Sequence, residues 1–152
     1  MQIVKSLIAA ALMAVTTSAA FAQDRDIARE EANRALVLEF YDTVFNQHDV
    51  AKGAAVLVED YKQHNPNVPN GKAPFVGYFT DFFAKNPQAR SRIVRSSTDG
   101  DLVWLHVHST NGPDDLGRAV VDILRVEDGK ITEHWDVIQP VPETSANDNT
   151  MF

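Results

Sequence analysis

The sequence predicts one α+β domain, in which three helical segments precede four antiparallel strands. Two observations predict this class. Apolar residues recur at helical spacing in the first half of the chain, and the second half consists of runs rich in β-branched residues with Asp-Gly pairs between them. A length of 152 residues fits a single domain. We expect the helices to lie on the concave face of a curled sheet.

The first helix is predicted over residues 26–46, where apolar side chains recur every four residues at Ala32, Leu36, Phe40 and Val44. Asp49 is a candidate N-cap for a shorter helix that runs through residues 54–56. The third helix begins near Pro74 and ends at Asn86-Pro87. Its apolar stripe consists of Phe75, Tyr78, Phe79, Phe82 and Phe83.

A short strand is predicted over residues 57–64, before a loop that holds two prolines and an Asn-Gly pair. Four longer strands follow, over residues 89–98, 102–109, 118–126 and 131–139. Asp99-Gly100 and Asp128-Gly129 separate the first pair and the last pair as hairpin turns.

Composition excludes several classes of protein. Hydrophobic residues make up 44% of the chain, which argues against disorder, and the absence of cysteine removes disulfide scaffolds and thiol nucleophiles. The formal net charge of −7 argues against nucleic acid and anionic membranes as partners. No glycine-rich phosphate loop is present.

Residues 1–22 have the plan of a secretory signal peptide. Lys5 precedes a short apolar run, and Ala20-Phe21-Ala22 is an Ala-x-Ala cleavage site. We expect cleavage after Ala22, which leaves residues 23–152 as a single domain in the periplasm or outside the cell, without a membrane anchor.

The last hairpin predicts which side chains face the helices. A two-residue turn at Asp128-Gly129 places Glu127 opposite Lys130, and uninterrupted pairing then places Asp122 opposite Trp135. The more apolar face carries both of these residues together with Glu133. A carboxylate among apolar side chains has a raised pKa unless it is paired, which is the property that a general base needs.

Asp122 is therefore the candidate base, and His64 and His106 are candidate partners that converge with it to polarise a carbonyl oxygen. Other roles stay open: Asp122 in a structural ion pair, and the histidines as hydrogen-bonded strand residues. His106 and His108 share one side of a strand and, with His64 or Asp122, also suit a metal. Because this spacing is generic, we expect neither a metal nor a cofactor.

Aromatic residues exceed what the core of such a small domain requires, and we expect some of them to surround a flat, apolar ligand. The candidate ligand-binding residues are Trp135, Trp104, Tyr61, Phe79 and the second carboxylate, Glu133.

Three segments carry a resemblance to a known family: residues 61–66 (YKQHNP), 102–106 (LVWLH) and 121–139 (VDILRVEDGKITEHWDVIQ). The chain resembles SnoaL-like proteins of the superfamily named after nuclear transport factor two. The resemblance implies a cone-shaped α+β fold, a homodimer and a deep pocket between helices and sheet. In polyketide cyclases of this kind an aspartate removes a proton next to a carbonyl before aldol closure, without metal or cofactor. Asp122 matches that base and His106 the histidine beside it.

The sequence therefore predicts a cofactor-free acid–base enzyme that acts on a hydrophobic, carbonyl-containing small molecule. One alternative is a periplasmic binding protein that holds a ligand in the same pocket without chemistry. Another is a hydrolase or lyase that uses a divalent metal.

Overall fold

The computed structural model describes residues 25–152, and the signal peptide expected at residues 1–22 lies outside them. The described chain contains α1 (Ile27–Phe45), α2 (Val50–Gly53), a 3₁₀ turn (Ala54–Val56), β1 (Leu57–Gln63), α3 (Lys72–Lys85), β2 (Arg90–Asp99), β3 (Leu102–Thr110), β4 (Arg118–Glu127) and β5 (Lys130–Pro140). These elements confirm the predicted class. The helix and strand ends lie within about two residues of the predicted ones.

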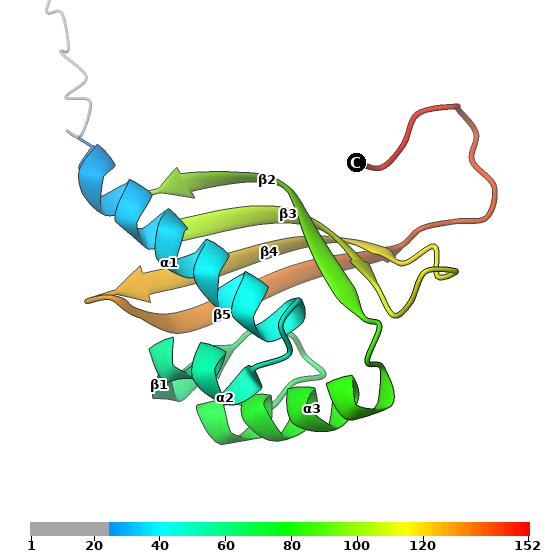
Figure 1. Ribbon diagram of the computed structural model, residues 1–152. Helices are drawn as coiled ribbons and strands as arrows, with labels where there is room; N and C mark the ends of the chain where they lie inside the picture. Colours follow the sequence, from blue (N-terminus) through cyan, green and yellow to red (C-terminus); the bar gives the residue numbers. More distant parts are fainter. Residues whose placement is uncertain (1–24) are drawn as a thin grey trace, which may run out of the picture.

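The five strands form one sheet in the order β1-β5-β4-β3-β2. The last four strands are antiparallel, as expected, whereas β1 pairs with β5 in the parallel direction. Helix α1 crosses one face of the curved sheet, and α3 lies near β1 at one side of that helix (Figure 1). The helices thus cover the concave face, as predicted. None of the described helices is long and apolar enough to span a bilayer.

The core lies between α1 and the inner face of the sheet. Helix α1 contributes a buried stripe that includes Val37, Phe40 and Val44, and its first turn is capped by the Asp26 carboxylate, which accepts from the Arg29 amide at 3.0 Å. Glu30 is also buried. The Arg25 guanidinium and the Thr98 hydroxyl donate to its carboxylate and, with Arg25 as the larger cause, lower its pKa to about 2.

The sheet carries an irregularity that the sequence analysis missed. The β4–β5 turn follows the prediction, with positive φ at both Asp128 and Gly129 and Glu127 opposite Lys130. Beyond the turn, however, Val126 pairs with Ile131 and Arg125 with Glu133, so Thr132 is an extra residue. Because of this bulge, Asp122 lies opposite Asp136, and the predicted pairing with Trp135 is wrong. Every β5 side chain beyond Thr132 therefore faces the side opposite to the predicted one.

Candidate functional site

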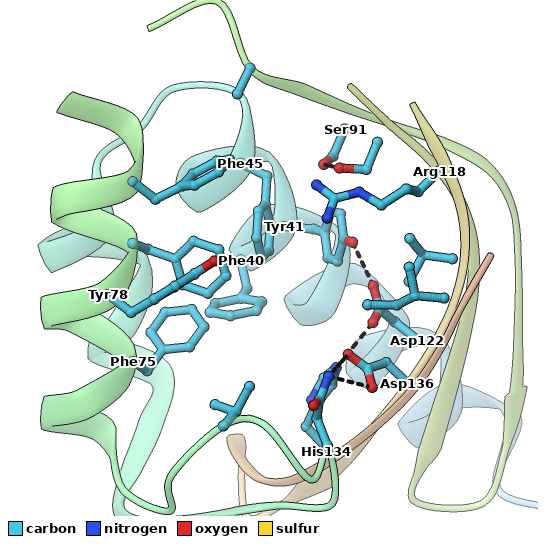
Figure 2. A pocket seen from close by; sticks show the side chains of 18 of the residues that line it. Phe40, Tyr41, Phe45, Phe75, Tyr78, Ser91, Arg118, Asp122, His134 and Asp136 are labelled. Carbon is cyan, nitrogen blue, oxygen red and sulfur yellow. Dashed lines mark hydrogen bonds and ion pairs between the residues drawn. The ribbon is translucent and has the colours of Figure 1, made fainter. Parts of the chain in front are cut away.

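A cavity of about 210 Å³ lies between α1, α3 and the inner face of the sheet. Its helix side is aromatic, and Figure 2 shows Phe40, Phe45, Phe75 and Tyr78 there. Its sheet side is polar, with Asp122, His134 and Asp136 from β4 and β5 facing these rings across the space. A cavity with one apolar wall and a few convergent polar groups is the usual form of a small-molecule site.

Asp122 lies at the centre of a hydrogen-bonded chain. Its side chain is buried, with 6% of the residue exposed. The Tyr41 hydroxyl donates to Oδ2 at 2.5 Å, and Nε2 of His134 lies 3.0 Å from Oδ1. Two partners with N–H or O–H groups compensate the charge of an ionised carboxylate in an apolar setting. A carboxylate has about four lone-pair positions, so Asp122 can still accept a further proton or hydrogen bond.

The parallel pairing of β1 with β5 brings two further polar side chains to the site. Gln63 pairs with His134 in that register, and its Oε1 lies 2.8 Å from Nδ1 of the imidazole. Asn65, which follows β1, donates from Nδ2 to both carboxylate oxygens of Asp136, at 2.9 and 2.8 Å. Both ring nitrogens of His134 are thus engaged, which fixes the orientation of the ring beside Asp122.

Two tyrosines next to Asp122 remain protonated. Burial raises the pKa of Tyr41 well above its ordinary value, and the charge of Asp122 raises it further. The pKa of Tyr61 is also raised, mainly by burial and then by Asp122 and Asp136. Both hydroxyls therefore keep their proton at physiological pH, and that of Tyr41 donates to Asp122.

Within residues 25–152, three side chains at this site also have the geometry to share a metal ion. Ligand atoms of Asp122, His134 and Asp136 lie within 4.8 Å of one another. A metal at this point would have to replace the hydrogen bond between His134 and Asp122. The metal alternative based on His106 and His108 is not supported. Both lie on the outer face of the sheet, away from Asp122, and within residues 25–152 their ligand atoms do not cluster with those of His64.

The structure places some of the predicted site residues in the cavity. Asp122, Tyr61 and Phe79 line it, as the sequence analysis expected. His134 and Asp136 also line it, although the predicted register assigned them to the opposite face. The bulge at Thr132 has no recognisable sequence signal, and the polar residues His134 and Asp136 on one face of β5 were the available indication.

Glu133 and Trp135 lie on the outer face and do not line this cavity, again because of the bulge. His64 lies there too, so its predicted convergence with Asp122 is wrong. The His64 ring stacks on Trp135 at 4.5 Å between centroids, and its Nε2 donates to Oε1 of Glu133 at 2.8 Å. With Nε of Arg125 donating to Oε2 at 2.9 Å, these bonds lower the pKa of Glu133, and the His64 bond contributes most.

His106 and Trp104 are also on the outer face, where they border a shallow hollow with Arg95 and Val121. The Arg95 guanidinium donates to Nδ1 of His106 at 2.7 Å. The alternation of β3 explains this placement: its buried residues are Val103, Leu105 and Val107, so the residues between them face outward. His106 therefore does not reach Asp122.

Solved structures with the same fold confirm the architecture. A candidate ketosteroid isomerase from Kribbella flavida is 23% identical, with a TM-score of 0.63 over 78% of this chain and 85% of that one. A candidate polyketide cyclase from Bacillus cereus is 22% identical, with a TM-score of 0.56 over 70% and 74% of the two chains. An LEH-like epoxide hydrolase from M. tuberculosis is 19% identical, with a TM-score of 0.59 over 73% and 85%.

Curated protein sequences gave no match to this chain. The family model described as the SnoaL-like domain matches residues 37–134, which is more than half of the chain and includes Tyr41, Asp122 and His134. The five-stranded curved sheet, the helices on its concave face and this match agree. The protein belongs to the family of SnoaL-like domains, in the nuclear transport factor two-like superfamily.

Proposed function

We propose that this protein is a cofactor-free acid–base enzyme that moves a proton next to the carbonyl group of an apolar small molecule. The observation that carries the proposal is Asp122, a buried carboxylate on the wall of a largely aromatic cavity, held between Tyr41 and His134. Proton transfer by a positioned carboxylate contributes about 10²- to 10⁴-fold to a rate.

In the proposed reaction Asp122 accepts the proton from the carbon beside the carbonyl. The electron pair of that C–H bond moves to the carbonyl oxygen, which becomes an enolate. His134 orients Asp122 and Tyr41 donates to it, so the base is held in place before the substrate binds. Return of the proton to a different carbon gives an isomer, and attack of the enolate carbon on a second carbonyl gives an aldol product.

The aromatic wall of the cavity favours an apolar substrate. Phe40, Phe75 and Phe79 face the polar residues across the cavity, and their ring faces provide contact area without hydrogen-bonding groups. Similar folds in a candidate ketosteroid isomerase and a candidate polyketide cyclase are consistent with carbonyl chemistry, although identities below 25% relate only the folds.

Hydrogen–deuterium exchange provides the test. Butyrophenone, an apolar ketone, is incubated with the protein in heavy water, and loss of the proton signal beside its carbonyl is followed by NMR. We expect the wild-type protein to accelerate this exchange. The exchange rate with Asp122→Asn should be lower than the wild-type rate by about 100-fold or more, because an amide cannot accept the proton.

The matched controls are two histidine variants. His134→Gln should slow the exchange, because it removes the partner of Asp122, whereas His64→Gln on the outer face should leave the rate unchanged. Exchange at the wild-type rate with Asp122→Asn would contradict the assignment of Asp122 as the base. Binding of butyrophenone by the wild-type protein without exchange above the buffer rate supports the alternative, a protein that holds its ligand without chemistry.

A further inference from the structure

The cavity has a second polar region, separate from the acidic one. Ser91 of β2 pairs with Ser109 of β3, and Ser109 pairs with Arg118 of β4. Directly opposed residues of neighbouring strands share a face, so these three side chains form a row across the sheet. All three line the cavity. Figure 2 shows the Arg118 guanidinium extending into the cavity beside Ser91.

An apolar row separates this polar row from the acidic one. Val120 pairs with Ile138 one step further along the inner face, and both line the cavity. The next inward-facing pair is Asp122 with Asp136. Along β4 the cavity wall therefore presents a cation, an apolar side chain and a carboxylate in turn. The Cα atoms of Arg118 and Asp122 are about 13 Å apart along an extended strand.

Within the described residues Arg118 has no carboxylate partner, in contrast to Arg25, Arg34 and Arg125. Arg125 donates to both Asp101 and Glu133, and Arg25 donates to Glu30. Within residues 25–152, Arg118 forms no ion pair, and its one hydrogen bond is a long contact of 3.4 Å from Nη2 to Oδ1 of Asn111. A guanidinium has five N–H donors in a planar fork, so most of them remain free to bind a ligand.

The backbone before Arg118 is constrained to this position. Gly117 has a φ of +78°, which disfavours other residues, and a Cβ atom there would lie 2.3 Å from the carbonyl oxygen of Ser109. This close approach brings the start of β4 against the end of β3, so Arg118 is presented next to Ser109 by rigid backbone rather than by a flexible loop.

We infer, as an extension of the proposed function, that the substrate carries a carboxylate that Arg118 binds while its carbonyl group lies at Asp122. The guanidinium fork matches a carboxylate with two parallel hydrogen bonds, and the Ser109 hydroxyl, which accepts from Ser91 Oγ at 3.5 Å, is a further donor beside it. Asp122 and Asp136 repel a carboxylate from the opposite end of the cavity, so the substrate binds in one orientation. The substrate class is an apolar keto acid.

Binding of an acid and its neutral ester tests this inference. The probes are δ-benzoylvalerate, an aryl ketone with a carboxylate on a flexible chain, and its methyl ester, and affinities are measured by isothermal titration calorimetry. We expect the wild-type protein to bind the acid at least about tenfold more tightly than the ester. Arg118→Gln should remove this preference and leave ester affinity unchanged. Arg118→Lys should retain part of it, because the charge remains without the fork.

Arg29→Gln is the matched control, since it removes the same charge from an exposed position on α1. Arg29→Gln should change neither the affinity for the acid nor the affinity for the ester. Failure of the wild-type protein to prefer the acid by this margin overturns the inference, as does an equal loss of acid and ester affinity in Arg118→Gln. Either result leaves the assignment of Asp122 standing, because that assignment depends on proton exchange in butyrophenone, which has no carboxylate.

Discussion

At the scale of single residues, Tyr41 is the group on which the buried charge of Asp122 depends. Its hydroxyl donates at 2.5 Å to a carboxylate that apolar side chains surround, and burial keeps the tyrosine protonated. We predict that Tyr41→Phe lowers the free energy of unfolding by about 1–3 kcal/mol, because one oxygen of a buried carboxylate loses its donor while the ring packing remains. Urea denaturation followed by circular dichroism measures this change.

Tyr78→Phe is the control for that measurement, because it deletes the same hydroxyl from a residue that is 63% exposed at the edge of the cavity. We expect its stability to match the wild type. Equal stability of Tyr41→Phe and Tyr78→Phe would show that the bond to Asp122 contributes nothing to folding.

At the scale of elements, local sequence signals predicted the helices and hairpins but not the register of β5. The spacing of Phe75 and Phe79 and the turn at Asp128-Gly129 act within a few residues, so a single sequence shows them. The bulge at Thr132 depends on how β5 fits against β4 and β1 together, which no local pattern records. One extra residue was enough to exchange the faces of Trp135 and His134.

Thr132 also offers a test of what the bulge costs. Its Oγ1 is buried and has no hydrogen-bond partner among residues 25–152. We predict that Thr132→Val raises the free energy of unfolding by about 1 kcal/mol, because valine keeps the β-branched shape and removes an unpaired polar atom. Urea denaturation again provides the measurement.

The same substitution at Thr98 should have the opposite sign. The Thr98 hydroxyl donates to the Glu30 carboxylate at 2.9 Å, so Thr98→Val removes a donor from a buried charge and should destabilise the protein. If Thr132→Val proves less stable than the wild type, the hydroxyl has a partner in solution and the bulge carries no unpaired group.

At the scale of the whole molecule, the site is assembled from segments that are far apart in the chain. Asp122 and Tyr61 were found from the sequence, since a carboxylate on an apolar strand face and an aromatic residue on a short strand are local features. Gln63 and Asn65 were not, because they meet His134 and Asp136 only through the parallel pairing of β1 with β5. That contact joins residues about seventy positions apart.

The outer face of the sheet leads to a prediction about assembly. Val121 lies between His106 and Val137 in one row across β3, β4 and β5, and the neighbouring row consists of Trp104, Ile123 and Trp135. Trp104, Val121 and Val137 are 37%, 38% and 69% exposed. A contiguous exposed apolar patch of this kind is typical of a protein–protein interface, and we propose that a second copy of this chain covers it.

Val121→Asp at the centre of this patch should give a monomer, because two charges would be buried against each other across a two-fold interface. Size-exclusion chromatography with light scattering should show twice the mass of one chain for the wild type and the mass of one chain for the variant. Ile27→Asp, at an exposed position on α1, introduces the same charge away from the sheet and should remain dimeric. A wild-type protein that is monomeric at all concentrations would leave the patch exposed and contradict the proposal. If Val121→Asp dissociates the dimer and keeps the exchange activity of the wild type, each subunit carries a complete site, as expected from a cavity on the opposite face of the sheet.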